Sequence, residues 1–111
     1  MASYMLLFWA PKQFFAGPPR SPDAARASAE RWHSWTETLQ NGGHEPTGGQ
    51  LEPDAACVTQ AGVTSGTLAA EHLMGGYVIV KASSLDAAAE LARGCPLVAI
   101  GGTVEVRPLM A

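Results

Sequence analysis

Two stretches of the chain are apolar on both of their alternating faces, which predicts strands covered on both sides. They run from Tyr4 to Trp9 and from Tyr77 to Lys81. A strand with one face in water would alternate apolar and polar side chains, and these two do not. A third stretch, from Thr103 to Arg107, alternates strictly and is bounded by glycine and proline. We therefore predict three core strands, of which the last has one polar face.

Two helices are predicted between these strands. Ser21-Pro22 is typical of an N-cap followed by a first helical turn, and this helix should run to about Gln40. Its apolar stripe, at helical spacing, consists of Ala25, Ala29 (or Ser28), Trp32, Trp35 and Leu39. Ser83 and Asp86 match the spacing of a capping box, so the second helix is expected to begin at Ser83. Its stripe consists of Leu85, Ala88, Ala89 and Ala92.

The middle of the chain carries a weaker signal. It predicts two short strands, Gly48–Leu51 and Ala55–Thr59, joined by a turn and followed by a loop with a little extended structure from Gly62 to Gly66. A loop is also expected from Pro11 to Pro19. The order of elements is β-α-β-β-α-β, the ferredoxin-like arrangement of the α+β class, in which an antiparallel sheet carries both helices on one face. We expect residues 1–111 to form a single domain.

The helices cover only one face of this sheet, so the second apolar face would be exposed to water in a monomer. An apolar patch of that size is unusual on a soluble monomer, and the same face of a second copy would cover it through a two-fold interface. We therefore predict a homodimer, in which two four-stranded sheets form a barrel with the helices outside. Val104 and Val106 should then face the helices. Thr103, Glu105 and Arg107 would face the partner, where the two charged groups either pair or line a wet cavity.

Composition and charge narrow the classes of function. The 111 residues are 47% hydrophobic and 15% charged, as expected for one globular domain. The formal net charge is −3 with only seven Lys and Arg residues, which argues against nucleic acid and acidic lipid as partners. The early apolar run is too short to cross a membrane. We expect a cytoplasmic protein in which Cys57 and Cys95 are reduced thiols.

Several segments match one known family in order along the chain. They are Tyr4-Met5-Leu6-Leu7, the aromatic pair Trp32 and Trp35, Gly75-Gly76-Tyr77-Val78-Ile79-Val80, Ser84-Leu85-Asp86-Ala87-Ala88, Gly94-Cys95-Pro96 and Gly102-Thr103-Val104-Glu105-Val106-Arg107-Pro108. On these residues the chain resembles the YCII-related, or DGPF-domain, proteins. The resemblance implies a ferredoxin-like dimeric α/β barrel whose activity is largely unassigned. The superfamily includes small enzymes that act on aromatic or lactone substrates.

The chain departs from this family at one position that bears on chemistry. Members often carry Asp-Gly-Pro-Phe shortly before the Gly-Gly-Tyr motif, whereas this chain has Thr64-Ser65-Gly66-Thr67 there. The aspartate that the resemblance assigns as acid or base is therefore missing. Glu71 and His72 lie between the two motifs. They are candidates for acid/base chemistry, because a histidine oriented by a carboxylate can act as a general base near neutral pH.

The other candidate pocket residues are Tyr4, Trp32, Thr64, Ser65, Glu105 and Arg107. A solvated loop histidine is the alternative interpretation of His72, and core packing is the alternative for Trp32. No metal-ligand spacing and no cofactor motif stands out, so neither a metal nor a cofactor is expected. Two functions stay open. One is a small-molecule-pocket protein, with acid/base chemistry on an aromatic or lactone-type metabolite. The other is a non-catalytic dimeric ligand-binding or accessory module.

Overall fold

A computed structural model describes residues 1–14, 20–68 and 70–111. Its main sheet contains the strands β1 (Ala2–Pro11), β2 (Thr47–Gln50), β5 (His72–Ala82) and β6 (Thr103–Pro108). These strands are antiparallel and lie in the order β2-β5-β1-β6, which is the ferredoxin-like order. A separate two-stranded sheet is formed by β3 (Ala56–Thr59) and β4 (Gly62–Ser65). The predicted α+β class and ferredoxin-like arrangement are confirmed, with an open sheet in the single chain.

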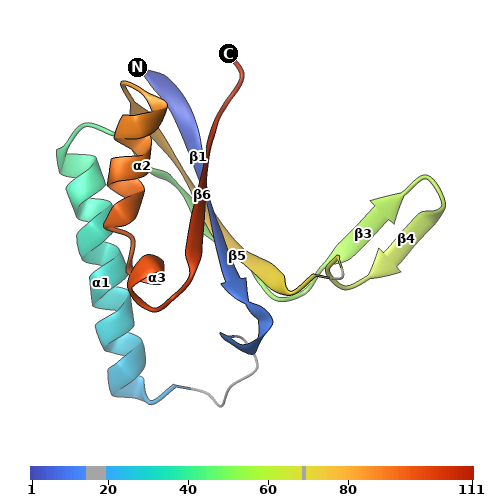
Figure 1. The fold of residues 1–111 in the computed structure, drawn as a ribbon. Helices are drawn as coiled ribbons and strands as arrows, with labels where there is room; N and C mark the ends of the chain where they lie inside the picture. The colour runs from blue at the N-terminus through green and yellow to red at the C-terminus, as the bar shows by residue number, and fades with distance from the viewer. Residues whose placement is uncertain (15–19, 69) are drawn as a thin grey trace.

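The helices lie on one face of the main sheet (Figure 1). They are α1 (Pro22–Asn41), α2 (Leu85–Arg93) and α3 (Pro96–Ala99), and a 3-10 turn, η1 (Lys12–Phe14), follows β1. The core between sheet and helices is apolar and contains Tyr4, Leu6, Phe8, Trp35, Leu39, Val80, Ala82, Ala88, Ala92 and Cys95. Val104 and Val106 pack against this core, as the alternation of the last strand predicted. Of the predicted loop from Pro11 to Pro19, residues 15–19 lie outside the described residues.

The first helix begins where the sequence indicates. The hydroxyl oxygen of Ser21 accepts a hydrogen bond from the backbone N–H of Ala24 at 3.1 Å, and Pro22 is the first helical residue. The predicted apolar stripe is only partly correct, because Ala25 and Ala29 are exposed, whereas Ser28, the alternative to Ala29, is half-buried. The first half of α1 extends past α3 (Figure 1).

Three aromatic rings join the second half of α1 to the sheet. The ring centroids of Phe8 and Trp32 are 5.3 Å apart, and those of Trp32 and Trp35 are 5.9 Å apart in an edge-on arrangement. The indole N–H of Trp35 also donates to the backbone oxygen of Leu91 at 3.1 Å. This hydrogen bond and the ring contacts connect β1, α1 and α2 at one point.

The two short strands predicted in the middle of the chain are present as β2 and β3, but the turn between them does not make them a hairpin. Instead of forming a hairpin with the next strand, β2 pairs with β5, so that Gly48 lies opposite Val78. The Gly62–Gly66 stretch, expected as a loop, forms β4, and β3 pairs with it. Strand β5 is also longer than expected and begins at His72. Strands this short and neutral carry no side-chain pattern that specifies a partner, so the topology of the whole sheet decides the pairing.

The second helix begins one residue later than the capping-box spacing indicates. The cap is Ser84, whose hydroxyl oxygen accepts from the backbone N–H of Ala87 at 3.0 Å. Ala88 and Ala92 of the predicted stripe are buried, whereas Leu85 and Ala89 are exposed. Two consecutive serines make the register ambiguous in the sequence, and the packing of Ala88 and Ala92 on the sheet decides it.

Replacing Ser84 by alanine is expected to lower the free energy of unfolding by about 1 kcal/mol, because an orphan N–H of the first turn loses its acceptor. Ser83→Ala is the matched control, and its effect should be close to zero. Chemical denaturation monitored by circular dichroism measures both variants. A larger loss for Ser83→Ala would place the cap where the sequence pattern put it and contradict the structure.

Candidate functional site

The face of the main sheet that points away from the helices is lined with apolar side chains. Along β1 the residues alternate, with Tyr4, Leu6 and Phe8 buried against the helices and Met5, Leu7 and Trp9 half-buried on the other face. Directly paired residues of an antiparallel sheet share a face. The pairs on the open face are Met5 with Ile79, Leu7 with Tyr77, and Trp9 with Met74. Each of these six side chains is half-buried within the chain.

Three polar groups of this open face come from β6. Arg107 lies opposite Met5, Glu105 opposite Leu7, and Thr103 opposite Trp9. This confirms which residues of the last strand point away from the helices. Because alternate residues of a strand are about 6.6 Å apart along it, the carboxylate and the guanidinium border neighbouring parts of the apolar face.

Glu105 is held by a residue that the sequence analysis did not assign to a site. The indole N–H of Trp9 donates to Oε1 of Glu105 at 3.0 Å. This hydrogen bond orients the carboxylate and leaves its second oxygen for another donor. None of the salt bridges found among the described residues involves Glu105 or Arg107. The two charges therefore do not neutralise each other within one chain.

His72 and Glu71 lie at one end of the open face. His72 is the first residue of β5 and pairs with Pro11, two residues beyond the pair of Trp9 and Met74, so it shares their face. It was expected in a loop. Both side chains are exposed, and they line a shallow hollow with Pro11, Lys12 and Gln13. The backbone N–H of Lys12 donates to the backbone oxygen of Glu71 at 3.1 Å and closes this end of the sheet.

The structure separates the remaining predicted site residues from this face. Tyr4 is buried in the core, and Trp32 packs against the same core, on the helix side of the sheet. Thr64 and Ser65 lie on β4, in the hairpin outside the main sheet. Arg107 and His72 share the open face but lie at its two ends, about 20 Å apart along the strands. The candidates that do lie on the open face therefore form two groups, Glu105 with Arg107 and Glu71 with His72, and Trp9 lies between them.

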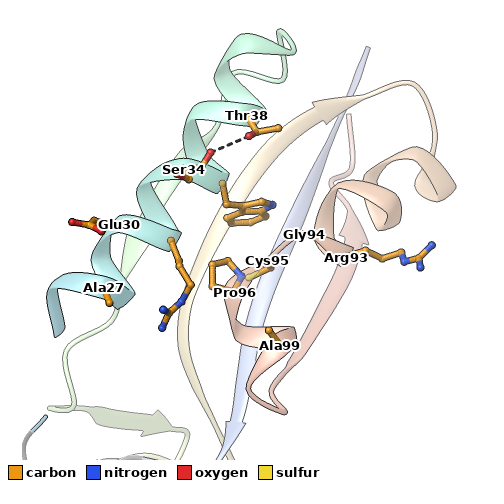
Figure 2. Close-up of a pocket in the computed structure, with 11 residues that line it drawn as sticks. Ala27, Glu30, Ser34, Thr38, Arg93, Gly94, Cys95, Pro96 and Ala99 are labelled. Carbon is orange, nitrogen blue, oxygen red and sulfur yellow. Dashed lines mark hydrogen bonds between the residues drawn. The ribbon is translucent and has the colours of Figure 1, made fainter. Parts of the chain in front are cut away.

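A groove also runs between α1 and the α2–α3 segment (Figure 2). Gly94, Cys95 and Pro96 form its floor, and Ala27 and Ser34 lie on the wall that α1 provides. Glu30 and Arg93 point away from the groove in Figure 2. Burial raises the pKa of the Cys95 thiol, which keeps it protonated at neutral pH and poorly nucleophilic. Arg31, Ser34 and Thr38 contribute further polar side chains to its lining.

Among the described residues, no group of three or more His, Cys, Asp and Glu side chains could hold a metal ion. Across that same part of the chain, no helix is both long and apolar enough to traverse a membrane. The candidate site is an apolar and aromatic sheet face bordered by the carboxylate of Glu105 and the guanidinium of Arg107, with His72 at one end. The sequence indicated this face because two of the predicted strands are apolar on both of their sides. Only the register of β1 and β5 shows that Trp9, Met74 and Tyr77 lie together on this face.

The fold and the site define a class of protein: a small ferredoxin-like α+β domain with helices on one face of its sheet and an open apolar surface on the other. Residues 12–111 match the YCII-related domain, and the chain belongs to this family. This confirms the resemblance noted in the sequence. A comparison with proteins of curated function gives no significant match.

Proposed function

We propose that the protein is a homodimer that binds a small molecule between the open faces of its two sheets. The observation that carries this proposal is the row of half-buried apolar and aromatic side chains on the open face, from Met5 to Trp9 and on the paired residues of β5. A contiguous apolar face marks an interaction surface. The same face of a second copy covers it by two-fold symmetry, and the stacked sheets form a barrel.

The accessible surface of the isolated chain supports association. The chain exposes 7831 Å², whereas a compact monomer of its mass exposes about 5,800 Å². The excess of about 2,000 Å² per chain is larger than the roughly 800 Å² that each partner buries in a standard interface, and for two chains together it comes to about 4,000 Å², in the range of obligate homodimers. The radius of gyration is 15.4 Å, compared with about 13 Å for a compact chain of this length.

The side chains of the open face indicate the chemical class of the ligand. Trp9 and Tyr77 offer flat aromatic surfaces, and Met5 and Met74 are adaptable apolar contacts. Arg107 can hold a carboxylate or another anionic group, and the free oxygen of Glu105 can accept a hydrogen bond from the ligand. We therefore propose an aromatic metabolite with an acidic group; a lactone-type metabolite is the alternative that the family resemblance implies. The free thiols of Cys57 and Cys95 fit a cytoplasmic location, which stays a prediction.

Acid/base catalysis is the second candidate, and the hollow beside His72 favours it. His72 and Glu71 line this hollow with Lys12, at the end of the face where the barrel would open. A ligand that reaches this end of the face would lie beside the imidazole of His72, a proton acceptor, and the ammonium group of Lys12. In the alternative, the protein binds its ligand without converting it, and His72 is a solvated residue at the rim.

Native mass spectrometry of freshly purified protein is expected to show a dimer that retains a small molecule. Arg107→Gln should lower the affinity for that molecule by about tenfold or more, because a charge-assisted hydrogen bond is lost. Glu105→Gln should lower it less. Arg93→Gln, an exposed arginine on the helix side, is the matched control and should leave the affinity unchanged.

The same measurement separates the two candidates. If His72→Ala leaves ligand occupancy unchanged and the retained molecule is not transformed, the protein is a binding module. If the retained molecule is converted by the wild-type protein and accumulates unconverted on His72→Ala, the protein is an acid/base enzyme. A monomer in solution, or an Arg107→Gln variant with unchanged affinity, would contradict the proposed binding site.

A further inference from the structure

The hairpin formed by β3 and β4 stands apart from the rest of the molecule. It forms its own two-stranded sheet and projects from the end of the main sheet, on the side opposite the helices (Figure 1). Val58 and Val63 pair directly across it and are 77% and 69% exposed. We refer to residues 56–65 as the hairpin arm. Burying these two valine side chains against another protein surface would be favourable, because it removes apolar area from water.

The hairpin arm has few of the features that stabilise a hairpin in water. An isolated two-stranded hairpin is at best marginally stable. Its turn residues are Gln60 and Ala61, whereas tight hairpins favour Asn-Gly or Asp-Gly. Apart from the ladder, the thiol of Cys57 donates to the backbone oxygen of Gly66 at 3.2 Å, the hydroxyl of Thr64 donates to the backbone oxygen of Cys57 at 3.5 Å, and the hydroxyl of Thr59 accepts from the N–H of Ala61. These contacts are all local to the arm, and none of them ties it to the main sheet.

The charge pattern also differs from that of an arm exposed to water. The sixteen residues from Ala55 to Ala70 contain no charged side chain, in a chain that is 15% charged overall. Exposed strand edges are normally protected from unwanted pairing by charged residues or proline. Depletion of charge is instead typical of the buried part of protein interfaces. The arm therefore has the composition of a segment that another protein surface covers.

We propose that the hairpin arm packs on the second copy of this chain and forms one wall of the ligand site between the two sheets. This inference rests on the proposed homodimer. The arm projects toward the side on which the partner's sheet would lie, and it leaves the main sheet next to His72, the first residue of β5. Each pocket is then complete only when both copies are present. Thr64 and Ser65, which lie outside the main sheet in the single chain, reach the site as part of this wall.

The arm is tested with the double variant Val58→Thr/Val63→Thr. Threonine keeps the shape and the strand propensity of valine but places hydroxyl groups in the proposed contact. The dimer dissociation constant should rise on the order of 100-fold, because two substitutions in each of two chains place four hydroxyl groups in the contacts of one dimer. Leu85→Thr/Val98→Thr is the matched control. These two residues are 46% and 43% exposed on the helix side, and the control should leave the constant unchanged.

Hydrogen exchange of the backbone amides provides the second measurement. In the wild-type dimer, amides of the hairpin arm should exchange at least about tenfold more slowly than in the Leu7→Asp variant, whose charge on the open face is expected to prevent dimerisation. Amides of β1 and β5 should stay protected in both proteins. If the wild-type protein is a dimer but the valine variant and the arm amides show no change, the arm inference fails and the proposed homodimer stands. If the wild-type protein is a monomer at every concentration, both fail.

Discussion

Replacing Trp35 by alanine is expected to lower the free energy of unfolding by about 3–5 kcal/mol. The side chain is 7% exposed, and its ring packs edge-on against Phe8 and Trp32. Truncation leaves a cavity where α1, α2 and β1 meet, and the backbone oxygen of Leu91 loses its donor. Small domains are stable by only about 5–15 kcal/mol, so this single change removes a large share of the total.

Urea denaturation at a fixed protomer concentration measures this effect, because the stability of a dimer depends on concentration. Trp35→Phe is the matched control. It keeps an aromatic ring in contact with Phe8 and Trp32 and loses mainly the hydrogen bond to Leu91, so a loss of about 1–2 kcal/mol is expected. If alanine and phenylalanine at this position unfold at the same midpoint as tryptophan, the aromatic cluster does not join these elements as the structure shows.

Replacing Leu7 by aspartate is expected to raise the dimer dissociation constant at least about 1,000-fold, because an unpaired charge buried in an interface costs several kcal/mol. Leu7 lies on the open face opposite Glu105, so the new carboxylate also faces a like charge. Leu7 is half-buried in the single chain and outside the helix-covered core, so the monomer should keep its fold.

Sedimentation velocity over a range of protomer concentrations measures the association, and circular dichroism checks the fold. Leu85→Asp is the matched control. Leu85 is 46% exposed and is the first residue of α2, where a negative charge is favourable. This control should remain dimeric. A Leu7→Asp protein that associates as tightly as the wild type would show that the open face is not the dimer interface.

The sequence predicted the parts of the fold whose patterns are local and strong. The cap at Ser21, the buried side chains Trp35 and Leu39, and the alternation of Val104 with Glu105 each follow from residue type and spacing. The weakest predictions fall in the Glu45–Thr67 region, where glycines and small polar residues carry no clear period. There the true partner of β2 is β5, which begins more than twenty residues later in the chain.

The residues of the candidate site likewise divide into those that the sequence could place and those that only strand pairing brings together. The sequence identified Glu105 and Arg107, because their side of the last strand is set by alternation alone. It could not show that Trp9 donates to Glu105, since these residues are 96 positions apart and meet only through the pairing of β1 with β6. It also grouped Tyr4 and Trp32 with Glu105, although the sheet separates them onto opposite faces.

By itself, the sequence determined the class of fold, the family and the presence of a second apolar sheet face, because each depends on periodicity or on motifs read in order. Only the tertiary structure decided which strands pair, which serine caps α2 and which side chains share the open face. These depend on contacts between distant segments, and their energies depend on packing and register rather than on the residues taken one at a time.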